Sequence, residues 1–399
     1  MPSPEFPNHA PGWKRLDGVD LLRGLAIFFV LMNHVNIRLL IAKVPYTAKI
    51  PALFVPSLVW NGQFGVQIFF AVSGFLITST TLRRWGSLSN VNARDFYRLR
   101  FARIAPLFIL VLLVLSILHA AQFQDFIVKP KTGGLGRALL AALTFHINVL
   151  EADRGYLPGS WDVLWSLSVE EMFYLFFPVV SRIFGAGKLF VAFLFGLILL
   201  GPFSRTVFTH GNEIWSEKSY LGSMDAIALG CITALIASRT LFSPHVLRIL
   251  AATGIAILTI VLGFSNRVYG TIIGRCGLEM TILAVGTCMI IVAAAQTQWK
   301  SPRILGPVLS LGRHSYEVYL LHMFVVFTFF NLFVSIGKPM AAVPILFLMV
   351  TLISGAFGAV AARCYSEPMN RLLRKHSNRG DLGSVIEDRP ALQPANAPG

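Results

Sequence analysis

The chain alternates between long apolar runs and short polar connections. Each long run holds about 20 residues, the length that a helix needs to cross the hydrocarbon core of a bilayer. The ten predicted spans are 20–42, 58–82, 101–121, 165–184, 188–206, 219–238, 246–264, 273–296, 314–336 and 341–364. A further apolar segment, 135–150, is shorter, and we predict a re-entrant or interfacial helix there. The pattern predicts an all-α, polytopic membrane protein.

The two ends of the chain are polar and contain proline. We therefore predict an N-terminal cytoplasmic segment over 1–15, a membrane domain over 16–370 and a disordered cytoplasmic tail over 371–399. A basic pair precedes the first apolar run, as in a signal peptide. Because the run continues past Leu40 with no small-residue cleavage site, we predict that it stays in the protein as its first span.

Composition supports a membrane protein. Hydrophobic residues make up 55% of the chain and charged residues only 13%, whereas soluble proteins carry about 25% charged residues. The net charge of +15 would suit a nucleic-acid partner, but the basic residues lie in short loops, where membrane topology places them. Soluble, disordered and nucleic-acid-binding proteins are thereby excluded. The four cysteines form no CxxC pair, and we predict no metal site.

Basic residues in the loops predict the orientation in the membrane. Segment 83–103 holds six arginines, the strongest cytoplasmic mark in the chain, and it follows the second span. A second basic cluster, 371–379, follows the last span. Ten spans place both clusters on the same side, whereas an eleventh span at 135–150 would separate them. We predict a protein of the plasma (inner) membrane with both termini in the cytoplasm.

A charged side chain inside a span costs at least ~2.5 kcal/mol on insertion scales, so it normally faces protein or water. Arg23 and His34 both lie in the first span, eleven residues apart. That separation is about 16 Å along a helix and about three full turns, so both side chains share one face. Arg23 would lie near the cytoplasmic surface and His34 near the middle of the membrane. The alternative interpretation of His34 is a hydrogen-bonded histidine of the protein core. This interpretation is less favoured because Arg23 lies on the same helix face.

Three further arginines, Arg98, Arg100 and Arg103, lead directly into the third span. They are either a plain orientation signal or a site for a polyphosphate at the cytoplasmic mouth. Arginine suits the second role because its planar fork binds phosphate oxygens in pairs.

Two more polar clusters lie near the ends of predicted spans, at spacings that keep their members on one helix face. The first is Ser166, Glu170 and Tyr174, preceded by Trp165, and the second is Ser315, Tyr319 and His322. Asp225 and Glu279 are isolated carboxylates in other apolar runs. Interfacial anchoring is the alternative interpretation of both clusters.

Five sequence segments together resemble the acyltransferase 3 family of integral-membrane acyltransferases. They are LDGVDLLRGLAIFFVLMNH (16–34), GVQIFFAVSGFLI (65–77), DFYRLRFARIAPLF (95–108), WSLSVEEMFYLFFP (165–178) and LGRHSYEVYLLH (311–322). The resemblance implies about ten helices, with Arg23 and His34 in the active site. It also implies acyl-CoA as the donor, the Arg98, Arg100 and Arg103 motif for its binding, and Glu170 as a functional carboxylate. One departure precedes Asp225, where family members often carry an arginine and this chain reads Gly222-Ser223-Met224.

The leading hypothesis is an O-acyltransferase that moves an acyl group, most simply acetyl, from cytoplasmic acyl-CoA to a hydroxyl of a cell-surface or lipid-linked carbohydrate or glycolipid. No permanently bound cofactor is expected. His34 would be the base, Glu170 would orient it or hold the sugar, and Arg23 would link it to the CoA path. The residues predicted to contact substrate are Trp165, Ser166, Tyr174, Tyr319 and His322.

Two other classes of function stay open from the residues alone. A transporter for a lipid-linked sugar or a small solute also uses intramembrane charges. Release of CoA by the purified protein would support the enzyme, whereas substrate counterflow without CoA release would support the transporter. A non-catalytic scaffold leaves the buried charges unexplained.

Overall fold

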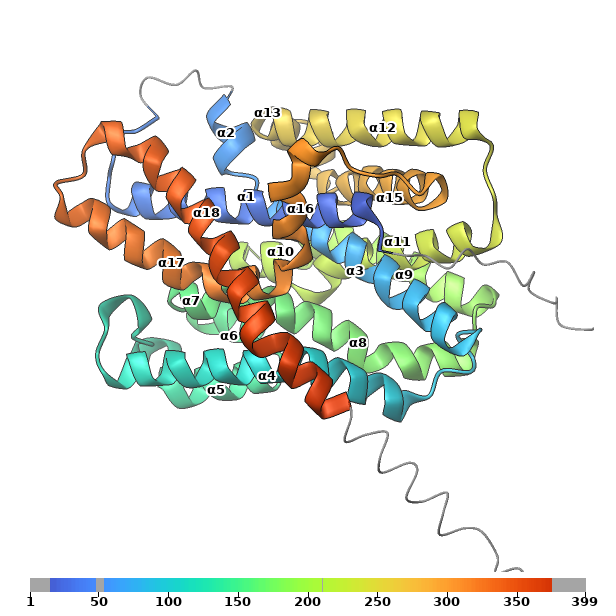
Figure 1. Cartoon of the computed structure of the whole chain (residues 1–399), viewed down its shortest axis with the longest axis horizontal. Coiled ribbons are helices and arrows are strands. Elements are labelled where there is room, and N and C mark those ends of the chain that lie inside the picture. Colours follow the sequence, from blue (N-terminus) through green and yellow to red (C-terminus); the bar gives the residue numbers. More distant parts are fainter. Residues whose placement is uncertain (1–14, 48–53, 210, 375–399) are drawn as a thin grey trace, which may run out of the picture.

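The computed structural model describes residues 15–47, 54–209 and 211–374. Within these ranges the regular structure is entirely helical, and ten helical stretches are long and apolar enough to cross a membrane (Figure 1). They are α1 Asp17–Ile41, α3 Gly62–Trp85, α4 Ala93–Ala120, α7–α8 Gly159–Phe184, α9 Lys188–Thr206, α10–α11 Glu213–Arg239, α12 Pro244–Gly263, α15 Glu279–Thr297, α17 Ser315–Ser335 and Met340–Arg374, which contains α18 Val343–Ala361. The predicted all-α membrane protein with ten spans is confirmed.

Several of these stretches are interrupted by short breaks. Gly159–Phe184 consists of α7 Gly159–Asp162 and α8 Leu164–Phe184, and Glu213–Arg239 consists of α10 Glu213–Lys218 and α11 Tyr220–Arg239. The last helix continues past α18 as far as Arg374, so it takes in the first four residues of the predicted tail. The rest of that tail and residues 1–14 lie outside the described residues.

The apolar segment predicted over 135–150 forms two short helices, α5 Gly134–Leu143 and α6 Ile147–Arg154. A helix of ten residues is about 15 Å long, half the thickness of a hydrocarbon core. α5 contacts α4 and runs beside it in the bundle (Figure 1). It therefore does not add an eleventh span, as predicted, and its depth in the membrane stays a prediction.

The centre of the bundle is held together by glycines that let helices approach closely. On α3, a Cβ added to Gly74 would lie 1.9 Å from the carbonyl oxygen of Ile227 on α11. On α11, a Cβ added to Gly230 would lie 2.0 Å from the carbonyl oxygen of Ala71 on α3. Small residues at such crossings are typical of membrane helices, which pack through van der Waals contact. The two helices are thus fixed against each other in one register.

Two glycines also fix α1 against α16 (Gly306–Arg313). A Cβ on Gly24 would lie 2.0 Å from the carbonyl oxygen of Val308, and a Cβ on Gly312 would lie 1.8 Å from that of Asp20. α1 also contacts α3, α15 and α17. The rotation of α1, and with it the direction of its polar face, is therefore set by close contacts.

A buried ion pair joins four helices. Arg205 on α9 lies 2.9 Å from an Asp225 carboxylate oxygen on α11, and Asp225 is fully buried. Gln67 on α3 donates to the other carboxylate oxygen at 2.9 Å, and Thr281 on α15 donates to the first at 2.5 Å. Arg205 also donates to the carbonyl oxygen of Gly277 at 2.9 Å. Arg205, which comes from another helix, therefore neutralises Asp225, and these satisfied groups join α3, α9, α11 and α15.

Candidate active site

Two cavities lie inside the helical bundle. The first, about 460 Å³, is lined by Arg23, Arg103 and Glu170, and we call it the basic chamber. The second, about 470 Å³, is lined by His34 and Lys218, and we call it the histidine chamber. Both are lined by Val66 and Tyr319, so they meet at these two residues.

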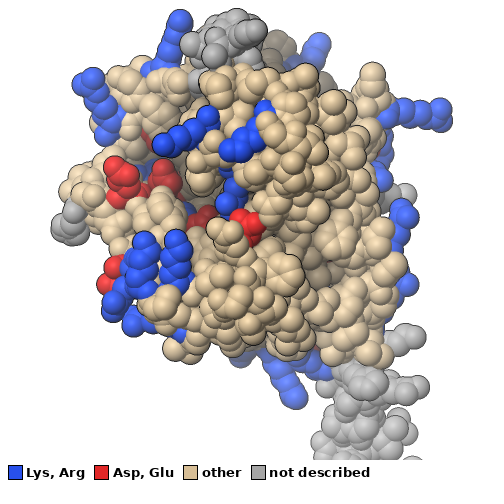
Figure 2. All heavy atoms as spheres, turned by 90° about the vertical axis from the view of Figure 1, so that its left-hand side faces the viewer, with Lys and Arg blue, Asp and Glu red and all other residues tan. Residues whose placement is uncertain are grey.

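The chambers occupy opposite ends of the bundle. α1 contributes Arg23, near its start, to the basic chamber, and His34 and Arg38, near its end, to the histidine chamber. The predicted common face of Arg23 and His34 is therefore a polar face that runs along both cavities. The surface at the end where α1 finishes is hollowed, and acidic and basic side chains gather around the hollow (Figure 2).

Arginines dominate the charge of the basic chamber. The arginines that line it come from α1, α3, α4 and the last helix, and among the described residues Glu170 is the one carboxylate in the lining. These arginines are Arg23, Arg83, Arg84, Arg100, Arg103 and Arg374. Within the part of the chain that the structure describes, no hydrogen bond or ion pair holds Arg23 or Arg103. The chamber therefore presents two guanidinium groups that an anion would satisfy.

Arg100 is held more firmly than the others. Its Nη2 lies 2.7 Å and its Nε 3.1 Å from one carboxylate oxygen of Glu171, and its guanidinium carbon lies 3.2 Å from the ring centroid of Tyr174. Arg98 does not line the chamber, and its Nη1 lies 3.6 Å from Oδ1 of Asp95. Of the three arginines predicted to bind phosphate, Arg100 and Arg103 thus line the cavity.

The α8 face predicted from the spacing of Ser166, Glu170 and Tyr174 does line the basic chamber. The Tyr174 hydroxyl donates to Glu170 Oε1 at 2.7 Å, and the Ser73 hydroxyl on α3 donates to the same oxygen. Ser73 lies in the segment GVQIFFAVSGFLI, and no spacing pattern in the sequence marks it as functional. Only the packing of α3 against α8 shows that it completes this network.

The junction between the chambers is occupied by the Tyr319 hydroxyl. It accepts a hydrogen bond from Ser166 Oγ at 2.6 Å and donates to the carbonyl oxygen of Val163 at 2.9 Å. Both partners come from α8 or the turn before it, whereas Tyr319 belongs to α17. The hydroxyl is thereby fixed where the two cavities meet.

His34 packs against a second histidine. The ring centroids of His34 and His322 are 5.0 Å apart. Nδ1 of His322 lies 2.6 Å from the carbonyl oxygen of Tyr319, which can only accept, so Nδ1 carries the proton. Nε2 of His322 is then the acceptor of the neutral ring, and it is buried without a partner in the described residues. His322 lines neither chamber, and its ring contacts that of His34.

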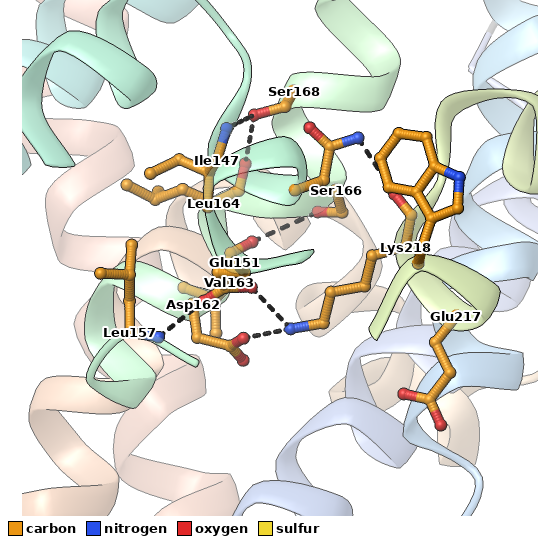
Figure 3. A network of polar contacts seen from close by, with 12 residues as sticks. Ile147, Glu151, Leu157, Asp162, Val163, Leu164, Ser166, Ser168, Glu217 and Lys218 are labelled. Atoms are coloured by element: carbon orange, nitrogen blue, oxygen red, sulfur yellow. Dashed lines mark hydrogen bonds and ion pairs between the residues drawn. The ribbon is translucent and has the colours of Figure 1, made fainter. Parts of the chain in front are cut away.

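A buried lysine organises the other wall of the histidine chamber. Lys218 Nζ lies 2.8 Å from Glu151 Oε2 and also donates to Asp162 (Figure 3). Nζ is 4.5 Å from the ring centroid of Tyr156. Burial, and then the neighbouring Asp162 carboxylate, raise the pKa of Glu151 well above its usual range. No signal in the sequence marks this cluster, because its members lie near the ends of apolar segments, where charged residues are ordinary.

The other residues predicted to act in catalysis or substrate binding line different cavities. Trp165 lines the histidine chamber, whereas Glu170 lines the basic chamber, away from the cavity that contains His34. The described residues contain no group of three histidine, cysteine or acidic side chains that could hold a metal ion.

An integral-membrane protein with a basic cavity and a histidine-containing cavity meeting inside the bundle has the architecture of a group-transfer enzyme or a transporter. The family model described as "Acyltransferase domain" matches residues 16–359. The chain belongs to the acyltransferase 3 family, as its motifs predict.

Two similar proteins carry names that describe an activity. A "Peptidoglycan O-acetyltransferase OatA" of Listeria monocytogenes serovar 1/2a is 28% identical over 77% of this chain and 49% of its own length. An "O-acetyltransferase OatA" of Staphylococcus aureus strain NCTC 8325 is 24% identical over 84% of this chain and 54% of its own length. The chain thus spans about half the length of the curated relatives it matches. No solved structure matches it.

Proposed function

We propose that this chain is an O-acetyltransferase that transfers acetyl from cytoplasmic acetyl-CoA to a carbohydrate hydroxyl presented from the other side of the membrane. The observation that carries the proposal is the meeting of two chambers at Tyr319, one lined by arginines and the other by His34. Family membership and the names of the relatives support the same chemistry. The acceptor is a cell-surface or lipid-linked carbohydrate.

The basic chamber suits the phosphate groups of CoA. Arg23 and Arg103 have guanidinium groups with no protein partner among the described residues, so a phosphate would satisfy them without breaking an ion pair. Arg100 is fixed by Glu171 and contributes a stationary positive charge. The segment 83–103 is cytoplasmic by the loop charges, so CoA would enter from that side. The thioester then extends toward Tyr319.

His34 acts as the general base in the histidine chamber. Neutral imidazole suits this role because its unperturbed pKa lies near physiological pH. The hydroxyl oxygen of the acceptor bonds to the thioester carbon, the carbon–sulfur bond breaks, and the hydroxyl proton passes through His34 to the departing thiolate. The Ser166 hydroxyl, which donates to Tyr319 in this structure, would turn its proton toward the oxyanion of the tetrahedral intermediate when substrate is bound.

His322 is proposed to position His34 rather than to contact substrate. Its proton is held on Nδ1 by the Tyr319 carbonyl, which leaves Nε2 to accept a hydrogen bond from one nitrogen of His34. The other nitrogen of His34 is then unprotonated and available to the acceptor hydroxyl. This hydrogen bond is not formed in the structure, in which Nε2 has no partner among the described residues and the two ring centroids are 5.0 Å apart, so it would form on a small movement of the rings.

The test is acetyl transfer by the purified full-length protein in detergent or liposomes. Free CoA should appear from acetyl-CoA only when a carbohydrate acceptor is present, and mass spectrometry should show an acetyl ester on that acceptor. Counterflow of a sugar without CoA release would instead support a transporter, for which the intramembrane charges are the main argument.

A further inference from the structure

The two chambers differ sharply in their charge. Besides Glu170, the charged side chains that line the basic chamber are arginines. In the histidine chamber two cations, Arg38 and Lys218, are matched by two carboxylates, Asp162 and Glu217. A binding site that selects a polyanion needs a surplus of positive charge, and the histidine chamber has none.

Both cations of the histidine chamber already have protein partners. Lys218 is paired with Glu151 and Asp162, and its side chain is only 5% exposed. Arg38 lies 3.6 Å from Asp125, and its guanidinium carbon is 4.1 Å from the ring centroid of Phe327. An anionic ligand would therefore have to compete with existing ion pairs for either cation.

The carboxylate of Glu217 is in the opposite situation. Within the described residues no hydrogen bond or ion pair holds it, and the residue is exposed to the chamber. Its side chain points away from the Lys218 network (Figure 3). An ionised carboxylate accepts hydrogen bonds and donates none, so hydroxyl groups satisfy it, whereas a second anion is repelled.

We infer that the histidine chamber is an acceptor subsite for an uncharged sugar ring, in which Glu217 accepts ring hydroxyls and excludes acceptors that carry a carboxylate or phosphate. Tyr156 and Trp165, which line the same cavity, offer aromatic surface to the apolar face of such a ring. The volume of about 470 Å³ falls within the range of small-molecule sites. This inference rests on the proposed function, because it takes the histidine chamber as the acceptor side.

The two probes are methyl β-glucoside and methyl β-glucuronide, which have the same ring and differ in the charge at C6. Isothermal titration calorimetry of the full-length protein measures their binding without requiring turnover. We expect the glucoside to bind about tenfold more tightly or better, as one or two like-charge contacts between the glucuronide and the carboxylates of the chamber imply. Equal affinities, or binding of neither sugar, would overturn the inference.

Variants at Glu217 identify the source of the selectivity. Glu217→Gln should reduce the preference for the glucoside at least about threefold, and Glu217→Lys should remove or reverse it. Glu213→Gln is the matched control, because Glu213 is an exposed carboxylate of the same helix α10 that does not line the chamber. A preference that survives both changes at Glu217 would also overturn the inference.

Acetyl-CoA turnover distinguishes this inference from the proposed function. Charge-selective sugar binding without any acetyl transfer would refute the transferase and leave the subsite in place. Acetyl transfer at equal efficiency to glucoside and glucuronide would leave the transferase in place and refute the subsite.

Discussion

Replacing Lys218 with methionine would isolate two carboxylates in the wall of the histidine chamber. The Lys218 side chain is 5% exposed and that of Glu151 is 0% exposed, so solvent screens their interaction weakly. After the change Glu151 would keep one donor, the Leu157 backbone N–H at 3.0 Å. Asp162, with its side chain 18% exposed, would lose its cation as well.

The size of the effect follows from the contacts that are lost. Two hydrogen bonds between charged groups disappear, each worth about 1.5–3 kcal/mol. Removal of one partner from a buried ion pair costs about 3–5 kcal/mol in proteins where this has been measured. We therefore expect Lys218→Met to lower the free energy of unfolding by about 3–5 kcal/mol.

Equilibrium unfolding by sodium dodecyl sulfate in mixed micelles measures this change. Thiol labelling of Cys231 and Cys288 reports unfolding, because both are buried, once the exposed Cys276 and Cys364 have been replaced by serine. The double variant Glu151→Gln/Lys218→Met should recover much of the loss, because it also removes the buried carboxylate. A loss below about 1 kcal/mol for Lys218→Met, or no recovery in the double variant, would refute the reasoning.

Four further predictions concern catalysis and topology. His34→Gln should lower acetyl transfer by about 10²–10⁴-fold without loss of stability, because glutamine cannot take the hydroxyl proton. His322→Leu should lower kcat more than it changes the acceptor KM, and His322→Gln should restore part of kcat by offering an acceptor to His34. Arg103→Ala should raise the KM for acetyl-CoA, whereas Arg98→Ala, outside the chamber lining, should change it little. A topology reporter after Lys131 should be extracytoplasmic and one at the C-terminus cytoplasmic.

Each of these has an outcome that contradicts it. Substantial turnover by His34→Gln would make that histidine structural. Equal kcat for the leucine and glutamine variants of His322 would remove its positioning role. Equal donor KM effects at Arg98 and Arg103 would separate CoA binding from the basic chamber. Reporters that give the same side would show that the segment around 135–150 has a different path through the membrane.

The sequence alone determined the features that depend on local pattern. Ten apolar runs became ten membrane-spanning helices, because a helix in lipid must satisfy its own backbone and needs a fixed length. Helical periodicity correctly placed Ser166, Glu170 and Tyr174 on one face, which lines the basic chamber. The combination of motifs was specific enough to identify the family, and the family match covers 16–359.

Only the tertiary structure decided which polar faces meet. Local spacing indicates that a side chain faces the protein interior, but not which of the nine other candidate membrane-spanning stretches of the described residues it faces. The neighbour of His34 is therefore His322, on α17, whereas Glu170 lines the other chamber. Arg205 met Asp225 in the same way. Such contacts depend on how closely the helices approach one another and on how each helix is rotated. Both are fixed by glycines at the helix crossings, and these glycines lie far apart in the sequence.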